Sequence, residues 1–305
     1  MESLYPQSPI AKQSVILFLV LLASVPRSAS AHQPRIVDGN PVRVSQPEVS
    51  QAFYGELTGT PVEYQIQSDA PFRLYVGLLV PDIPGARKDI SATIHRTGKD
   101  GIKTVAILDG ESHAWKPFYE KFAQDDYFGG QEYRAGDSPD GSGIKGRTVA
   151  SGTYLITVSN PTNHGKYALA IGDVEEWPFS EIISAAVTVP RIKAQFFGKS
   201  PLRILISPFG WGYVLILYFL AFGIGLLLRM LMRRFVKLRL ANRPRNITGP
   251  GRLIRASLGL ALLLWAITTS WHPLLILLSG FCFFEAMFSW CGLYAAIGKS
   301  SCPLK

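Results

Sequence analysis

One stretch limits what this chain can fold into: an apolar run at residues 204–228 is followed at once by a run of basic residues. The apolar run contains no charged side chain, and a second charge-free run covers residues 256–284. About 20 apolar residues in a helix are enough to cross a bilayer. The pattern therefore predicts a membrane-spanning helix, a basic loop and a helical hairpin. The basic residues number nine, with no acidic residue among them: Arg229, Arg233, Arg234, Lys237, Arg239, Arg243, Arg245, Arg252 and Arg255.

The charge of the chain is unevenly distributed along it. The 305 residues carry a formal net charge of +9, yet residues 32–180 hold 14 Lys and Arg against 19 Asp and Glu. A basic patch confined to one loop between hydrophobic helices is typical of the cytoplasmic side of a membrane protein. The distribution argues against nucleic acid as a partner and for the lipid bilayer.

Residues 1–31 have the features of a secretory signal peptide. An apolar core at residues 15–23 follows Lys12, and Ala29-Ser30-Ala31 offers a small-residue cleavage site. The core is shorter than the roughly 20 residues of a comfortable span. We therefore expect cleavage, with an uncleaved anchor as the alternative. Cleavage would place residues 32–203 outside the cytoplasm and the basic loop inside, as the positive-inside rule requires.

Residues 32–178 alternate apolar and polar positions over short segments, as in Val62-Glu63-Tyr64-Gln65-Ile66. Turn-forming residues separate these segments, for example at residues 160–165. Short strands of period 2 with turns between them predict an all-β sandwich or jelly roll. The three cysteines, Cys282, Cys291 and Cys302, lie outside this domain. We expect it to be stable through core burial without disulfides.

A long polar and aromatic insert, residues 109–147, interrupts the predicted strands. Long loops on sandwiches often carry function. Trp115 and Tyr127 could stack on a sugar, and Asp125 and Asp126 could bind its hydroxyls or a calcium ion. The alternative is that the insert covers the open end of the sandwich. The sequence contains no calcium-loop motif, nucleophile elbow, zinc-protease motif or phosphate loop, so we expect no catalytic residue, metal or cofactor.

The remaining segments complete a mixed fold class. Residues 179–203 combine apolar and basic side chains, which favours either an interfacial segment on the outer membrane face or a flexible linker. We expect a first span at 204–232, a basic cytoplasmic loop at 233–252, and a hairpin with a short cytoplasmic tail at 253–305. The chain would thus be a secreted β-sandwich followed by three transmembrane α-helices, one single span plus a helical hairpin.

Glu285 lies within the last predicted span, where an ionised side chain is costly. If the hairpin turns near His272, Arg255 lies about one helical turn from Glu285 on the facing helix. A structural ion pair is one interpretation, and a proton or ion pathway is the other. Cys291 and Cys302 follow near the cytoplasmic face. They could handle sulfur or form a redox pair, or they could be a packing residue and a reduced cytosolic thiol.

The end of the predicted sandwich resembles a known family of modules. Gly152-x-Tyr154-x-Ile156-x-Val158, followed by Gly165-x-Tyr167-x-Leu169, is similar to the bacterial pre-peptidase C-terminal β-sandwich family. Members are non-catalytic modules attached to secreted enzymes. The resemblance implies a binding or spacing role for the domain, although no protease domain accompanies it here.

The C-terminal residues resemble the YgaP-type inner-membrane two-helix family. The resemblance rests on Asn246-x-x-Gly249-x-Gly251-Arg252-x-x-Arg255-x-x-x-Gly259-x-x-Leu262, then Pro273, Gly280 and Cys291-Gly292-Leu293-Tyr294-x-x-x-Gly298-x-x-x-Cys302. In that family the hairpin often accompanies a rhodanese sulfurtransferase, which this chain lacks, so sulfurtransferase activity is not implied. Gly292 replaces a usual Pro, and Glu285 replaces a small or neutral residue.

Together these features predict a bacterial inner-membrane protein without enzymatic activity. It would present its sandwich to a periplasmic protein or glycan as a binding or scaffolding module. A thiol or sulfur-handling protein acting through Cys291 and Cys302 is the alternative. An ion-permeable assembly around Glu285 is a third hypothesis.

Overall fold

The computed structural model describes residues 32–98, 101–121, 123–135, 146–235, 245–297 and 300. The expected signal peptide and Cys302 lie outside the described residues.

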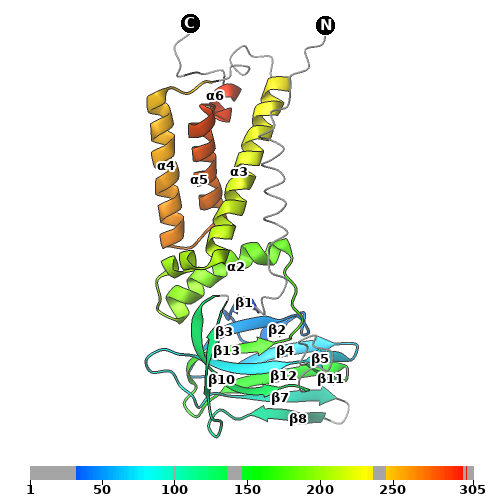
Figure 1. The fold of residues 1–305 in the computed structure, drawn as a ribbon. Helices are drawn as coiled ribbons and strands as arrows, with labels where there is room; N and C mark the ends of the chain where they lie inside the picture. The colour runs from blue at the N-terminus through cyan, green and yellow to red at the C-terminus, as the bar shows by residue number, and fades with distance from the viewer. Residues whose placement is uncertain are drawn as a thin grey trace. The chain divides into compact units, whose positions relative to one another are not determined.

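Two sheets form the sandwich predicted for residues 32–178 (Figure 1). Neighbouring strands are antiparallel except in the β1–β3 and β2–β4 pairs, which are parallel. A two-stranded sheet joins β5 (Phe72–Leu74) to β11 (Arg147–Val149). In sheet order, the six-stranded sheet contains β1 (Gln33–Ile36), β3 (Gln51–Thr58), β13 (His164–Ile171), β6 (Val76–Pro81), β10 (Asp125–Tyr133) and β9 (Lys116–Glu120). The five-stranded sheet contains β2 (Val42–Val44), β4 (Val62–Ser68), β12 (Gly152–Ser159), β7 (Ser91–Gly98) and β8 (Gly101–Leu108).

Alternating side chains of both sheets fill the core between them, because successive residues of a strand point to opposite faces. Ile66 and Ile156 enter it from one sheet, and Leu169 enters it from the other. Two fully buried tyrosines cross the core: the hydroxyls of Tyr64 and Tyr167 lie 2.9 Å apart and hydrogen-bond to each other. This bond offsets the cost of removing both hydroxyls from water.

The segment predicted to be an insert contains two strands, β9 and β10. Strand β10 pairs with β6 on one side and β9 on the other, with a register shift between Gly129 and Glu132. Its polar residues and glycines hide the period-2 signal. Its pairing with β6 places it in the sheet, and that pairing depends on residues far away in the sequence.

The segment between the sandwich and the membrane unit is helical. It consists of α2 (Phe179–Arg191), the π-helical turn η1 (Ile192–Phe196) and the 3₁₀-helix η2 (Pro201–Ile206). Pro190 lies inside α2. Because proline has no backbone N–H, the regular hydrogen-bond ladder is interrupted there. The wider π turn that follows brings the N–H of Phe197 to the carbonyl of Ile192 at 3.1 Å.

The membrane unit contains α3 (Pro208–Phe235), α4 (Gly249–Thr268), α5 (Pro273–Phe288) and the short α6 (Gly292–Ala296). In the part of the chain that the structure describes, two stretches are long and apolar enough to cross a membrane, Gly210–Met232 and Gly249–Thr268. Helix α5 is apolar but has only 16 residues, about 24 Å of helix. Helices α3, α4 and α5 lie side by side (Figure 1).

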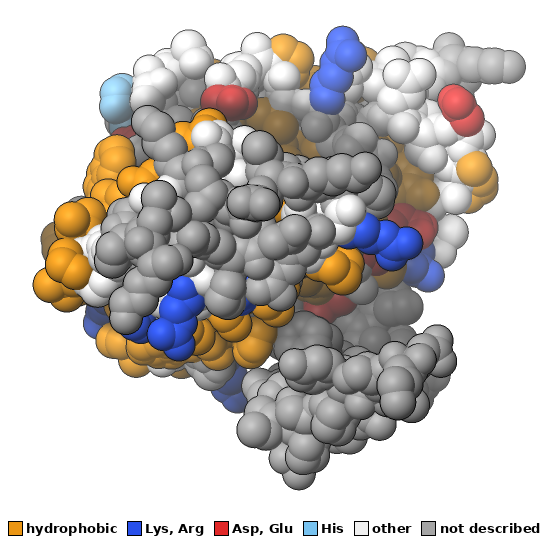
Figure 2. All heavy atoms as spheres, turned by 90° about the horizontal axis from the view of Figure 1, so that it is seen from above, with side chains coloured by type: hydrophobic (Ala, Val, Ile, Leu, Met, Phe, Trp, Pro, Cys, Tyr) orange, Lys and Arg blue, Asp and Glu red, His pale blue; other side chains and the backbone are white. Residues whose placement is uncertain are grey.

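Small residues and one hydrogen-bonded serine hold these three helices together. A Cβ on Gly280 of α5 would lie 2.9 Å from the Cβ of Ala221 of α3, so only glycine permits this approach. The Ser279 hydroxyl donates to the Gly259 carbonyl of α4 at 2.7 Å, and with its only proton so used it accepts from the Tyr218 hydroxyl of α3 at 2.7 Å. Seen from above, hydrophobic side chains gather along one edge of the molecule, with a few Lys and Arg side chains among them (Figure 2).

Candidate functional site

Among the described residues, two clusters of bonded polar side chains contain residues that the sequence nominates. The first, here called the junction cluster, joins β10 to η1 and contains Asp125, Asp126, Lys193 and Lys199. The second, here called the hairpin cluster, lies where α5 meets α4 and contains Asn246, Arg255, Glu285, Cys291 and Tyr294. Five of the eight residues that the sequence nominates fall in these clusters: Asp125, Asp126, Arg255, Glu285 and Cys291.

The junction cluster is centred on a fully buried ion pair. The side chains of Asp125 and Lys193 are each only 1% exposed, and their closest N–O distance is 2.9 Å. The Lys193 ammonium donates to both carboxylate oxygens of Asp125 and to the carbonyl of Ala123. These three acceptors match its three protons. Burial lowers the pKa of Lys193, although the charge of Asp125 acts in the opposite direction.

Lys199 adds a second positive charge at the edge of this pair. Its ammonium lies 3.4 Å from Asp125 and 3.7 Å from Asp126, and its side chain is 18% exposed. The carboxylate of Asp125 is therefore enclosed by two lysines of the connecting segment. In this structure it bonds to the chain itself rather than facing an open ligand site.

Aromatic side chains surround the junction cluster. The ring centroids of Tyr127 and Phe197 are 5.2 Å apart, as are those of Tyr54 and Phe196, and both pairs meet edge to face. The hydroxyls of Tyr54 and Tyr127 lie 3.0 Å apart. Burial raises the pKa of Tyr127 well above its usual range. The aromatic side chains of η1 and Phe197 therefore pack against β3 and β10. This apolar packing excludes water from the ion pair.

Helix α2 contacts both the sandwich and the membrane unit. Glu181 accepts a hydrogen bond from Arg35 of β1 at 2.7 Å. On another side of the helix, Ala186 and Val189 share one apolar cluster with Tyr213 of α3 and with Trp271 of the turn between α4 and α5. The segment 179–203 is therefore packed against elements on both sides of it in the sequence.

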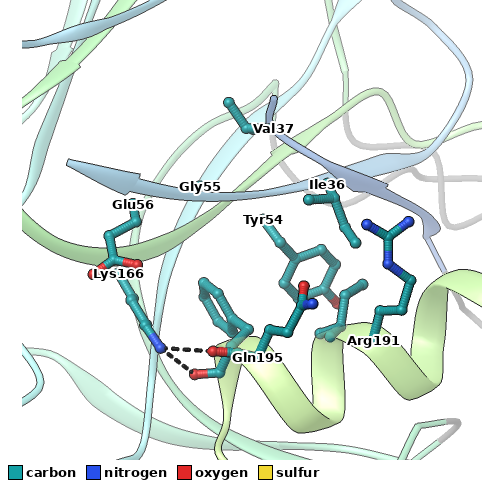
Figure 3. A pocket seen from close by; sticks show the side chains of 10 residues that line it. Ile36, Val37, Tyr54, Gly55, Glu56, Lys166, Arg191 and Gln195 are labelled. Carbon is teal, nitrogen blue, oxygen red and sulfur yellow. Dashed lines mark hydrogen bonds between the residues drawn. The ribbon is translucent and has the colours of Figure 1, made fainter. Parts of the chain in front are cut away.

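A shallow, open pocket of about 150 Å³ lies where η1 and the end of α2 meet β1, β3 and β13 (Figure 3). Lys166 crosses one side of it and donates to the carbonyls of Gln195 at 2.8 Å and Phe196 at 3.1 Å. These carbonyls end the π turn, so the lysine holds η1 against β13. Glu56 and Arg191 stand at opposite sides of the pocket and are exposed.

Trp115 is separated from the other nominated aromatic residue. Its ring packs against the core of the sandwich, and its indole N–H donates to the carbonyl of Gly110 at 2.8 Å. A Cβ on Gly130 would lie 2.8 Å from this ring, so the indole covers the backbone of β10 closely. Tyr127 belongs to the separate cluster with Phe196 and Phe197.

The hairpin cluster contains the ion pair that the hairpin spacing predicts. The guanidinium of Arg255 donates to Glu285 at 2.7 Å, and it also donates to the carbonyl of Gly251 at 3.2 Å. It lies over the ring of Tyr294, 5.1 Å from the centroid. The thiol of Cys291 adjoins both charged groups. Arg252 donates to the carbonyl of Ala286 at 2.7 Å, which makes a further link between α4 and α5.

Asn246 bonds to the chain on the other side of Cys291. Its side-chain amide donates to the Cys291 carbonyl at 2.9 Å, and its side-chain oxygen accepts from the Cys291 N–H at 2.7 Å. Its own N–H donates to the carbonyl of Ser289, a residue in the left-handed conformation with φ of 54°. The side chain of this fully buried asparagine bonds to both the N–H and the carbonyl of Cys291, as a neighbouring strand would, and it fixes the turn between α5 and α6.

Sequence reasoning did not nominate four members of these clusters: Lys193, Lys199, Asn246 and Tyr294. A lysine in an amphipathic segment normally faces water, and nothing around Lys193 in the sequence marks it as buried. Asn246 appears in the motif of the C-terminal resemblance, but its role becomes visible only where α4 meets the end of α5. Among the described residues, no group of three or more His, Cys, Asp or Glu side chains is placed to hold a metal ion.

Comparison with known proteins identifies the class of the C-terminal part. Residues 243–305 match the family model of the transmembrane domain of inner membrane protein YgaP-like. The match confirms the resemblance inferred from the motif of residues 246–302. The chain is thus a membrane protein that joins a YgaP-like transmembrane domain to a β-sandwich domain.

The sandwich is similar to a solved structure, the pre-peptidase C-terminal domain of a collagenase from Bacillus anthracis. The sequence identity is 10%, and the TM-score is 0.25. The alignment covers 45% of this chain and 96% of the other. No curated protein matches the chain.

Proposed function

We propose that this chain is a membrane-anchored binding or scaffolding protein that presents its β-sandwich on the periplasmic side of a bacterial inner membrane. The observation that carries the proposal is the junction cluster. A flexible tether needs no buried ion pair. Here the ammonium of Lys193 is removed from water and bonds to Asp125, so the segment is held against the sandwich. An arrangement of this kind holds a domain in a fixed orientation.

The proposed orientation in the membrane rests on the sequence and on the length of the helices. Residues 1–31 have the character of a signal peptide, and the nine basic residues from Arg229 to Arg255 favour the cytoplasmic side. Helix α5 serves as the third span because α6 continues the chain beyond its end. The amphipathic side chains around the ends of a short helix can bridge the remaining distance to the headgroups.

The chemistry of both clusters supports a structural role over catalysis. In each cluster, charged groups of separate elements bond to one another, and the cations also bond to backbone carbonyls. A catalytic group must instead reach its substrate. The surfaces left to bind a periplasmic protein or a glycan are then those of the sandwich itself.

Two experiments test the proposal. A reporter fused after Lys305 should be active only in the cytoplasm, and one inserted at Asp100 only outside; the reverse pattern at either site would refute the topology. In a second experiment, a Gly/Ser linker of equal length replaces residues 179–203. This chain should reach the membrane at normal abundance yet fail to complement a deletion strain. Full complementation would refute a role for the fixed orientation.

A further inference from the structure

The 3₁₀-helix η2 presents a small exposed surface directly before the first membrane span. Leu202 is 41% exposed and Ile206 is 72% exposed, although both are large apolar residues. The apolar stretch Gly210–Met232 begins four residues beyond Ile206. In any orientation of the chain, a residue so close to the start of a span lies at or near the membrane surface.

The orientation of η2 is fixed by its other side. Ile204 is 2% exposed and packs in the apolar cluster with Ala186, Tyr213 and Trp271. The Ser207 hydroxyl donates to the carbonyl of Ile204 at 2.7 Å and so closes the turn. With Ile204 held inside, Leu202, Arg203 and Ile206 are left exposed.

The charge on this surface is positive and uncompensated. Arg203 is exposed, and no ion pair among the described residues includes it. The carboxylates of Asp125 and Asp126, in the junction cluster, bond to Lys193 and Lys199 instead. Arg203 lies close enough to Lys193 to repel its charge. An anion bound at Arg203 would relieve this repulsion.

We propose that Leu202, Arg203 and Ile206 form a docking surface for an anionic phospholipid of the leaflet that faces the sandwich. The guanidinium of Arg203 binds the headgroup phosphate, for which its fork of N–H donors is suited. Leu202 and Ile206 contact the glycerol and upper acyl region, and Trp211 at the start of α3 is exposed as well. The proposal rests on the membrane anchoring proposed above, and it adds a specific lipid contact at η2, directly before the first membrane span.

The test places a photo-crosslinking residue on the surface of the full-length protein. Ile206→p-benzoylphenylalanine is reconstituted in nanodiscs of equal parts phosphatidylglycerol and phosphatidylcholine, and the lipid adducts are weighed after irradiation. A basic side chain near an anionic surface contributes about 1 kcal/mol, which corresponds to about fivefold enrichment of phosphatidylglycerol. The same substitution at Leu264, an exposed residue of the α4 span, should give adducts in the bulk ratio.

Two arginine variants test whether Arg203 causes the enrichment of phosphatidylglycerol. Arg203→Gln should return the adduct ratio at position 206 to that at position 264. Arg43→Gln removes an exposed arginine from strand β2 and should leave the enrichment unchanged. Equal ratios at positions 206 and 264 in the unaltered background would overturn the proposal, as would enrichment that survives Arg203→Gln. Lipid adducts at 264 without any at 206 would also overturn it, while leaving the proposed anchoring intact.

Discussion

Replacing Lys193 with methionine should detach the connecting segment from the sandwich. Methionine has a similar length but no charge, so the change removes the ammonium that bonds to Asp125 and to the Ala123 carbonyl. The carboxylate of Asp125 then stays in a site that is 1% exposed, with Lys199 at 3.4 Å as its remaining partner. Undocking of η1 would return this carboxylate to water, so undocking becomes easier.

The expected size of the effect follows from the burial of the pair. Removing one partner of a buried ion pair costs about 3–5 kcal/mol. Because Lys199 can still approach Asp125, we expect the lower end of that range, about 3 kcal/mol. A difference of 1.36 kcal/mol is a factor of about ten in an equilibrium. Undocking of the segment should therefore become roughly 150 times more frequent.

Hydrogen exchange on the full-length protein in nanodiscs measures this opening. The amide of Phe197 reports it, because its N–H bonds to the Ile192 carbonyl at 3.1 Å only while the π turn is formed. Lys121→Met, at an exposed lysine of the same domain, is the matched control. Adding Asp125→Asn to Lys193→Met removes the stranded charge and should restore much of the protection. The reasoning would be wrong if Lys193→Met changed exchange at Phe197 by less than about threefold.

Three further predictions concern other parts of the chain. Burial raises the pKa of Tyr167 to about 12, so its contribution to stability is complete below pH 10 and is lost as the pH rises from 10 to 12, about 3 kcal/mol in all. Urea unfolding of the sandwich between pH 8 and 12 should show this loss, and Tyr167→Phe should reduce it; an unchanged pH profile in the variant would exclude the tyrosine as its source. Glu285→Gln should lower the stability of the helical hairpin by about 2 kcal/mol, below the range for a fully buried pair because the side chains of Arg255 and Glu285 are 17% and 24% exposed; a denaturant titration in detergent that showed no difference would remove the pair from the list of stabilising contacts. The double variant Cys291→Ser with Cys302→Ser should complement a deletion strain, and a variant that is abundant in the membrane yet inactive would favour sulfur chemistry instead.

Most of the strands and helices could be predicted from local patterns. Strand β4 alternates Val62, Tyr64 and Ile66 toward the core, and period 2 is enough to indicate this. The stretch 204–228 identified the first span because the length of an apolar run is a local property. Arg255 could be placed within about one helical turn of Glu285, because a tight turn between two antiparallel helices limits which residues can meet.

The sequence by itself therefore determined a β-rich domain, the membrane unit and the pairing within its hairpin. Only the tertiary structure decided the role of Asp125, which bonds to a lysine 68 residues away, and that of Asn246, which reaches Cys291 across 45 residues. Patterns along a chain report which face of an element is apolar, since that depends on neighbours within a turn or a strand. Where one element docks on another depends on the shape and charge of both surfaces, and these exist only once the chain is folded.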